Sequence, residues 1–457
     1  MGSYDLQVWP QWLSGHLART WTDGFARFKA TGERNAQLEK DAQARALNRA
    51  STGEIRLLIQ FMSEVGAAMN GAGDATTFIR RTLQRIGRAY GLENVGVFVV
   101  PTLLLLRYGD DESTFVDLSS KIPADLRLDQ TAALYELISE AGAGAVSPST
   151  GLLRLREILA TSTRFPPLLR IIAVAVVAGG IVLTLEPSLQ EVLLSLGLGL
   201  LVGVLNQGGQ RWPQMWPLVP ATAGLLVGAV AFLLIDQGID CRPLRVIVPP
   251  LAIFLPGAAL TVSMIELSNG DIVAGGSRLA YGTIRLFLLI FGVLIAAQWV
   301  GLQGSPAEPE STALTEYGAL LGLVVFTLGV YVHFSGPQGS FPWLLLVVAA
   351  AWAGQQFGNA FLGGSLGGFV GGASMIIVAR SIATRPGAPP LMVSFTPAFW
   401  LLVPGAIGFE GLSRVFQESL QAGIDDLLAM LVTMIAIALG VLFGLIVSGS
   451  EQSREPY

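Results

Sequence analysis

Three charged residues lie within long apolar stretches of the sequence. Glu266 and Glu410 each follow a Pro-Gly pair, and Arg285 lies well inside an apolar segment. A charge near the centre of a membrane costs about 3 kcal/mol even on a permissive scale, so such residues mark a cavity or a partner. A buried carboxyl can carry a proton, and a guanidinium can hold a carboxylate. The alternatives are snorkelling of Glu266 to the interface and a structural ion pair of Arg285 with Glu266 or Glu410.

Two Pro-Gly pairs interrupt apolar segments at matching positions. PPLAIFLPGAAL aligns with PAFWLLVPGAIG, so that Pro256-Gly257 lies over Pro404-Gly405 at an offset of 148 residues. The same offset places the Gly-Val-Leu at 292–294 over the one at 440–442. A broken helix leaves backbone groups unpaired, which lipid cannot satisfy but a protein-lined cavity can. The pattern predicts substrate binding at the paired breaks, together with Arg285 and Glu410, and an ordinary proline kink is the alternative.

The composition requires lipid around much of the chain. Of the 457 residues, 52% are hydrophobic and only 13% are charged, about half the charged fraction of an average soluble domain. A membrane-spanning helix needs about 20 apolar residues, and most of the apolar segments approach that length. The segments lie near 168–185, 189–205, 217–235, 246–267, 276–300, 313–334, 341–357, 359–379, 391–412 and 425–447.

These segments predict an α-helical polytopic membrane protein with ten transmembrane helices in two halves, 166–300 and 313–447. Because each half has five segments, an odd number, the second half enters the membrane with opposite polarity, as in the inverted repeats of secondary transporters. Ten spans place both termini on one side. Six arginines in the loops and tail of that side, against three on the other, indicate that it is the cytoplasm.

The chain before the first apolar segment predicts a small cytoplasmic α+β domain. Residues 1–50 are polar with scattered aromatics and are expected to be flexible or interfacial, and 448–457 form a cytoplasmic tail. Residues 51–161 have the periodicity of an α-α-β-β-α-α domain, in which Asp74 caps the second helix and VGVFVVPTLLLLRY is one β-run.

Several functional classes are disfavoured. The net charge of −5 and the lack of a basic stripe argue against nucleic acid. One cysteine and two histidines supply no recurring zinc pattern, so neither a metal nor another cofactor is expected. The first thirty residues carry charge throughout and are not expected to be a cleaved signal peptide. A membrane-embedded enzyme remains an alternative, although no catalytic pattern favours it.

The first break and the residues after it resemble the threonine/serine exporter family. That family has a Pro-Gly, an acidic-Leu pair, a Gly-Asp, an Ala-Gly and then an arginine, and FLPGAALTVSMIELSNGDIVAGGSRL is similar throughout. The matching positions are Pro256, Gly257, Glu266, Leu267, Gly270, Asp271, Ala274, Gly275 and Arg278. Family members usually carry Asp where this chain has Glu266. LLVPGAIGFEGL resembles the family's C-terminal half, matching at Pro404, Gly405 and Gly411.

The resemblance implies export of threonine and serine, driven by the proton motive force, across the inner membrane of a prokaryote. The expected partners are these substrates, protons and the lipid bilayer, and a homo-oligomer is left open. Glu266 and Asp271 from the family-like segment, and Glu410 from the other half, are the candidates for proton coupling. Because related two-part systems are linked to dicarboxylate export, small dicarboxylates are the alternative cargo.

Overall fold

Two helices joined by a short turn begin the described part of the chain. The computed structural model describes residues 52–109, 114–119, 126–301, 317–363, 366–385, 387–402 and 420–448. Helix α2 (Thr52–Gly71) is followed by α3 (Thr76–Ala89). In α3 the apolar residues Ile79, Leu83 and Ile86 recur at three- and four-residue spacing and are fully buried.

A three-stranded antiparallel sheet follows, where one β-run and a second short strand were expected. The strands β1 (Gly96–Val100), β2 (Leu103–Gly109) and β3 (Thr114–Ser119) lie in that order. Val100 pairs with Leu103, so the chain reverses within Pro101 and Thr102. Proline has no N–H to donate to a sheet ladder, which is why the run divides into two strands here.

Two further helices complete this N-terminal unit, α4 (Leu128–Gly142) and α5 (Pro148–Ala160). Helix α5 begins with Pro148 in its first turn, and its N-cap Ser147 accepts a hydrogen bond from the Thr150 N–H at 3.2 Å. One apolar core joins these helices to the sheet. Its fully buried members include Phe61, Met62, Leu83, Leu104, Leu106, Leu134 and Leu155.

The rest of the described chain consists of apolar helices. Five are long and apolar enough to cross a membrane, and a sixth span is formed if a bent helix pair is counted as one. The helices are α6 (Pro167–Leu183), α7 (Leu189–Arg211), α8 (Val219–Asp236), α9 (Pro243–Leu251), α10 (Gly257–Ser268), α11 (Ile272–Val300), α12 (Gly318–His333), α13 (Phe341–Leu362), α14 (Gly367–Ala383), α15 (Leu391–Leu401) and α17 (Leu420–Val447), with 3-10 turns at Pro213–Leu218 and Ala252–Phe254.

The bent pair lies at the first Pro-Gly. Helix α9 runs through its 3-10 extension to Phe254, α10 begins at Gly257, and the two axes differ by 63°. Pro256 has no N–H and therefore cannot continue the hydrogen-bond ladder of the preceding turn. The break expected from the sequence is present.

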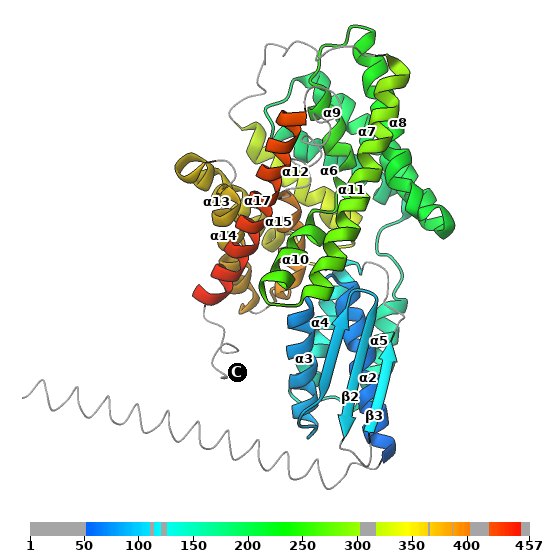
Figure 1. Ribbon diagram of the computed structural model, residues 1–457, viewed down its shortest axis with the longest axis vertical. Coiled ribbons are helices and arrows are strands. Elements are labelled where there is room, and N and C mark those ends of the chain that lie inside the picture. Colours follow the sequence, from blue (N-terminus) through cyan, green and yellow to red (C-terminus); the bar gives the residue numbers. More distant parts are fainter. Residues whose placement is uncertain are drawn as a thin grey trace, which may run out of the picture.

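Glycines allow two pairs of helices to touch along their backbones. Helix α8 packs along α11, and α14 packs along α17 (Figure 1). Small residues let helix backbones approach closely in an apolar environment. A Cβ atom added to any of four glycines would meet a backbone oxygen of the partner helix: Gly224 with Leu289, Gly292 with Ala221, Gly372 with Ile437 and Gly440 with Phe369.

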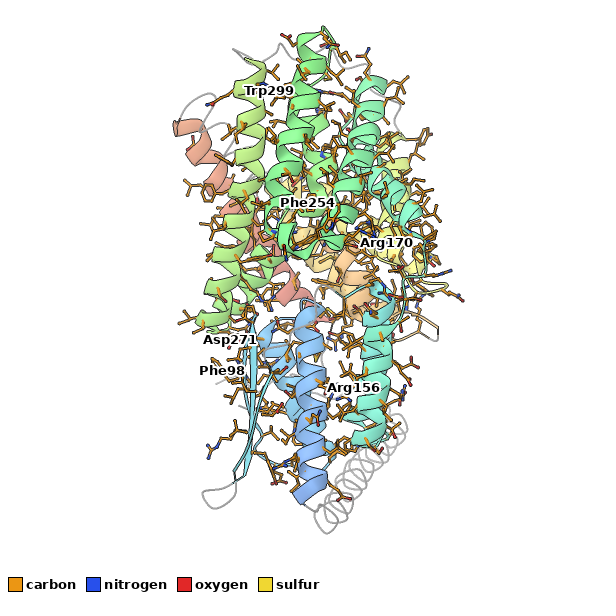
Figure 2. The ribbon with its side chains drawn as sticks, turned by 90° about the vertical axis from the view of Figure 1, so that its right-hand side faces the viewer. Phe98, Arg156, Arg170, Phe254, Asp271 and Trp299 are labelled. Carbon is orange, nitrogen blue, oxygen red and sulfur yellow. The ribbon has the colours of Figure 1, made fainter. Side chains whose placement is uncertain are left out.

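The N-terminal unit lies against one end of the helical bundle (Figure 1). The Leu128 N–H donates to the Phe334 carbonyl at 2.9 Å, and in the linker that follows the unit Arg164 donates to the Tyr331 hydroxyl at 2.9 Å. A second set of contacts lies at the turn between α10 and α11, where Figure 2 shows Asp271 at the junction of unit and bundle. The loops after α10 and α12 therefore both contact this unit.

Candidate functional site

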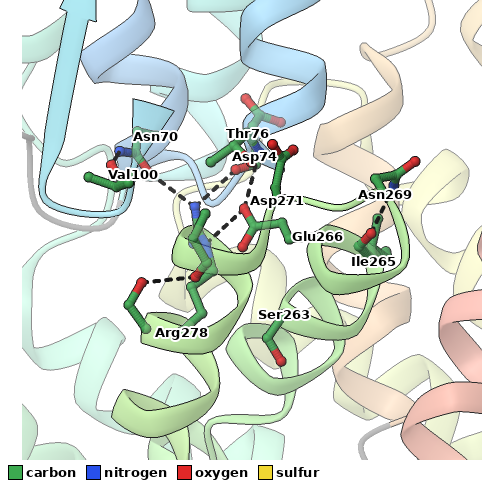
Figure 3. A network of polar contacts seen from close by, with 12 residues as sticks. Asn70, Asp74, Thr76, Val100, Ser263, Ile265, Glu266, Asn269, Asp271 and Arg278 are labelled. Carbon is green, nitrogen blue, oxygen red and sulfur yellow. Dashed lines mark hydrogen bonds and ion pairs between the residues drawn. The ribbon is translucent and has the colours of Figure 1, made fainter. Parts of the chain in front are cut away.

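The turn between α10 and α11 brings three family-like residues together. Glu266 lies near the end of α10, Asp271 directly precedes α11, and Arg278 lies two turns into α11. Gly270 has a φ of +82°, which glycine adopts without steric cost. The Asp271 N–H donates to the Glu266 carbonyl at 2.9 Å and closes the turn. As a result, the side chains of Glu266 and Arg278 lie side by side (Figure 3).

Glu266 is fully buried and is held from two sides. One carboxylate oxygen accepts hydrogen bonds from Arg278 Nε at 3.2 Å and from the backbone N–H of Thr76 at 3.1 Å. The other oxygen, Oε2, has no hydrogen-bond partner within the described residues. Thr76 is the first residue of α3, so the family-like segment binds the N-terminal unit directly. A proton could therefore bind to the Oε2 atom without displacing a hydrogen bond among the described residues.

Asp271 and Arg278 contact the same part of the unit. Asp271 forms an ion pair with Arg80 and accepts a hydrogen bond from the Thr76 hydroxyl at 3.1 Å. Arg278 Nη2 donates to the Asn70 side-chain oxygen at 3.0 Å and to the Asp74 carbonyl at 3.1 Å. These bonds fix the arginine against the turn that joins α2 to α3 (Figure 3).

Asp74 adds a third carboxyl to this region. Its side chain was expected to cap α3, but the N-cap is Ala75, and it is the Glu266 carboxylate that accepts the N–H of the first α3 residue, Thr76. Instead, Asp74 is 3% exposed and accepts a hydrogen bond from the Tyr135 hydroxyl at 2.6 Å. Burial raises the pKa of the Asp74 carboxyl from 3.8 to about 7, while the Tyr135 hydrogen bond and the charge of Arg278 lower it.

The resulting charged cluster consists of three carboxyls and two guanidiniums: Glu266, Asp271, Asp74, Arg278 and Arg80. One proton on a carboxyl makes the cluster neutral, and loss of that proton leaves one negative charge. Uncompensated charge is expensive where water is excluded. Asp74 is the member whose pKa is raised to about 7 by burial, and the cluster spans the contact between the N-terminal unit and the α10–α11 turn.

The predicted substrate residues of the first half lie away from this cluster. Pro256 is the N-cap of α10 and Gly257 its first residue, and both are buried. Arg285 lies on α11, two turns beyond Arg278, and is partly exposed. Of the two structural ion pairs considered for Arg285, the one with Glu266 is not formed, because Glu266 pairs with Arg278 instead.

Three predicted site residues, Pro404, Gly405 and Glu410, lie outside the described residues. Conversely, Asn70, Thr76, Arg80 and Tyr135 were not predicted and belong to the N-terminal unit. For Asn70 and Thr76 the only sequence signal is a polar turn, NGAGDAT, between two amphipathic helices, and Arg80 and Tyr135 lie outside that turn. Within the described ranges, no group of three His, Cys, Asp or Glu side chains is placed to hold a metal ion.

Comparison with known proteins places these observations in a family. The family model described as "Putative threonine/serine exporter" matches residues 60–300, more than half of the chain. Two uncharacterized proteins of Schizosaccharomyces pombe are similar: one is 22% identical over 80% of this chain and 45% of its own length, and the other 24% identical over 43% and 28%. The chain thus spans less than half the length of these relatives. No solved structure matches it.

Proposed function

Because this chain belongs to the threonine/serine exporter family, we propose that it exports threonine, serine or similar small amino acids and that protons drive the export. The observation that carries the proposal is the buried Glu266, which has one free oxygen and is clamped between Arg278 and the N-terminal unit. A proton-driven transporter needs a carboxyl that alternates between charge states while its surroundings change shape.

The proposed architecture is ten spans in two inverted five-helix repeats. Its support is the five long apolar helices, the bent pair and four shorter apolar helices, α6, α12, α14 and α15. The backbone contacts of the glycines add a second support, because those between α8 and α11 recur between α14 and α17 at an offset of 148 residues. The 148-residue offset also relates the two Pro-Gly pairs. Helix pairs with equivalent contacts are expected of an inverted repeat.

We place the N-terminal unit, about 51–161, and both termini in the cytoplasm, with the halves 166–300 and 313–447 in the membrane. The membrane proposed is the inner membrane of a prokaryote, although the two similar curated proteins come from a yeast. In this orientation the charged cluster lies at the cytoplasmic end of α10 and α11. A proton that enters the cell down its gradient would reach the cluster last and leave it for the cytoplasm.

Coupling is proposed to act through the cluster. Protonation of one carboxyl among Glu266, Asp271 and Asp74 neutralises the cluster and favours the packed arrangement seen here. Loss of the proton leaves a buried negative charge, which weakens the contact of the α10–α11 turn with the unit. The turn is continuous with α10, so its movement is transmitted to the bend at Pro256. We propose that cargo binds at that bend, beside Arg285. In the second half, the corresponding substrate-binding residues are proposed to be Pro404, Gly405 and Glu410.

The experiment is transport by purified protein in proteoliposomes loaded with labelled threonine, under an imposed pH gradient. Gradient-dependent efflux is expected for the wild type. Glu266→Gln and Asp271→Asn should reduce the response to the gradient while threonine binding persists, and Asp117→Asn on β3 is the matched control outside the cluster. Normal gradient-driven efflux in both amide variants would remove these carboxyls from coupling. Efflux of a labelled dicarboxylate, without efflux of threonine, would refute the proposal that the cargo is an amino acid.

A further inference from the structure

The first turn of α10 is a buried helix start without a cap. Pro256 and Gly257 are buried, and among the described residues no side chain accepts a hydrogen bond from the first turn. The first backbone bond is that of the Leu260 N–H to the Pro256 carbonyl at 2.9 Å. The N–H groups of Gly257, Ala258 and Ala259 have no acceptor within the described residues. Such groups are normally capped or hydrated, because leaving them unpaired is costly.

The Thr261 hydroxyl provides a second, independent observation. Thr261 is 0% exposed, and its hydroxyl has no hydrogen-bond partner within the described part of the chain. Ser195 on α7 is also fully buried and without a partner among the described residues, but three other buried hydroxyls on the apolar helices behave differently. Those of Ser263, Thr327 and Thr433 each donate to a carbonyl three or four residues earlier in their own helix. This back-bonding is the usual solution for a helical hydroxyl in an apolar environment, and Thr261 does not use it.

The two features lie at the same place. Thr261 follows Gly257 by four residues, and helical side chains lean toward the N-terminus, so its hydroxyl lies over the first turn. The side chains of that turn are a hydrogen and two methyl groups, so none of them can accept a hydrogen bond from the backbone N–H groups. A helix start also carries partial positive charge and attracts anions. A partner that suits both the free N–H groups and the Thr261 hydroxyl is therefore a hydrogen-bond acceptor with negative charge.

We propose that the first turn of α10, with the Thr261 hydroxyl, binds the carboxylate of the exported amino acid. This inference rests on the proposed export function and gives it a specific location. The carboxylate would accept hydrogen bonds from the free N–H groups of Gly257, Ala258 and Ala259 and from Thr261. Helix α11 passes beside this turn, because a Cβ added to Gly282 would lie 2.7 Å from the Leu260 side chain and 3.6 Å from the Pro256 Cβ, and Arg285 follows one turn later.

The test compares two ligands that differ at the carboxylate alone. Binding of L-threonine and of threoninol, in which a hydroxymethyl group replaces the carboxylate, is measured by calorimetry on the full-length protein in detergent. The variants are Thr261→Val, which removes the hydroxyl at nearly constant shape, and Thr261→Ser, which keeps it. Thr327→Val, which removes a back-bonded buried hydroxyl on α12, is the matched control. Thr261→Ala replaces the valine variant if that one does not fold.

The wild type should bind threonine at least about tenfold more tightly than threoninol, since charged hydrogen bonds are lost with the carboxylate. Thr261→Val should weaken threonine binding about tenfold and leave threoninol binding unchanged, while Thr261→Ser and Thr327→Val should resemble the wild type. If the wild type exports threonine but Thr261→Val binds both ligands normally, the location is wrong and the export function stands. If the wild type neither binds nor exports any amino acid, both are overturned.

Discussion

Replacement of Asp74 by asparagine should remove a titration near neutral pH from the N-terminal unit. Burial raises the pKa of the Asp74 carboxyl from 3.8 to about 7. Because the folded state binds this proton more tightly than the unfolded state, the corresponding stability is fully present below pH 3.8 and is lost as pH rises to about 7. The whole difference corresponds to about 4 kcal/mol, and about 2 kcal/mol of it is lost above about pH 5.5.

The assay is amide hydrogen exchange of α2 and α3 in the full-length protein in detergent, corrected for the intrinsic effect of pH. Between about pH 5.5 and about pH 8, the wild type should lose about 2 kcal/mol of protection, and Asp74→Asn should lose none of it because the amide cannot ionise. The control Asp117→Asn should behave like the wild type. Infrared difference spectra provide a direct readout, because the carbonyl band of the protonated carboxyl should disappear in Asp74→Asn.

The phenol of Tyr135 supplies an internal check on the same reasoning. Its hydroxyl donates to the Asp74 carboxylate at 2.6 Å and lowers the pKa of that carboxyl. Tyr135→Phe should therefore move the midpoint of the titration to a higher pH than in the wild type. The reasoning is refuted if wild type and Asp74→Asn show the same pH dependence, or if Tyr135→Phe moves the midpoint downward.

Three further predictions concern stability, measured as thermal unfolding of the full-length protein in detergent. Gly292→Ala places a Cβ against a backbone carbonyl of α8 and should destabilise the protein by about 1–3 kcal/mol. Gly276→Ala, with nothing within 4 Å of its Cβ, should not destabilise it, because alanine is favoured over glycine inside a helix. Arg242→Ala leaves Glu191, 1% exposed, without its ion-pair partner and should cost about 3–5 kcal/mol; an unchanged midpoint would show that the pair is dispensable. Ser147→Ala should destabilise the protein by about 1 kcal/mol through loss of the α5 cap. A loss of stability as large as that of Arg242→Ala would contradict this prediction.

The sequence was most informative about the apolar helices. Long apolar runs separate from polar loops because a membrane admits few charges, and Pro256 marks the bend because proline interrupts the helix ladder. It was less informative in the N-terminal unit, where Pro101 was read as part of one apolar run. A two-residue turn inside such a run changes neither the composition nor the alternation of side chains. The third strand was therefore missed.

For the site, sequence similarity identified residues but not their partners. Glu266, Asp271 and Arg278 were singled out by the family-like segment, and they do lie together. Arg285 was considered as the partner of Glu266 because both lie in apolar segments, but Arg278 is placed closer by the turn at Gly270. The contribution of the N-terminal unit could not be inferred, because no local pattern links a polar turn to a segment far along the chain.

The same long separation has a consequence for biosynthesis. The Thr76 N–H and the Glu266 carboxylate that it binds are 190 residues apart. At about 5–20 residues per second, the ribosome delivers the α10–α11 turn roughly 10–40 seconds after α3. A unit with its own apolar core can fold within that time, and until the turn arrives water must serve Asn70 and Thr76 as their partner. Assembly of this protein is therefore ordered in time, because the N-terminal unit can be folded before the α10–α11 turn that it binds has been synthesised.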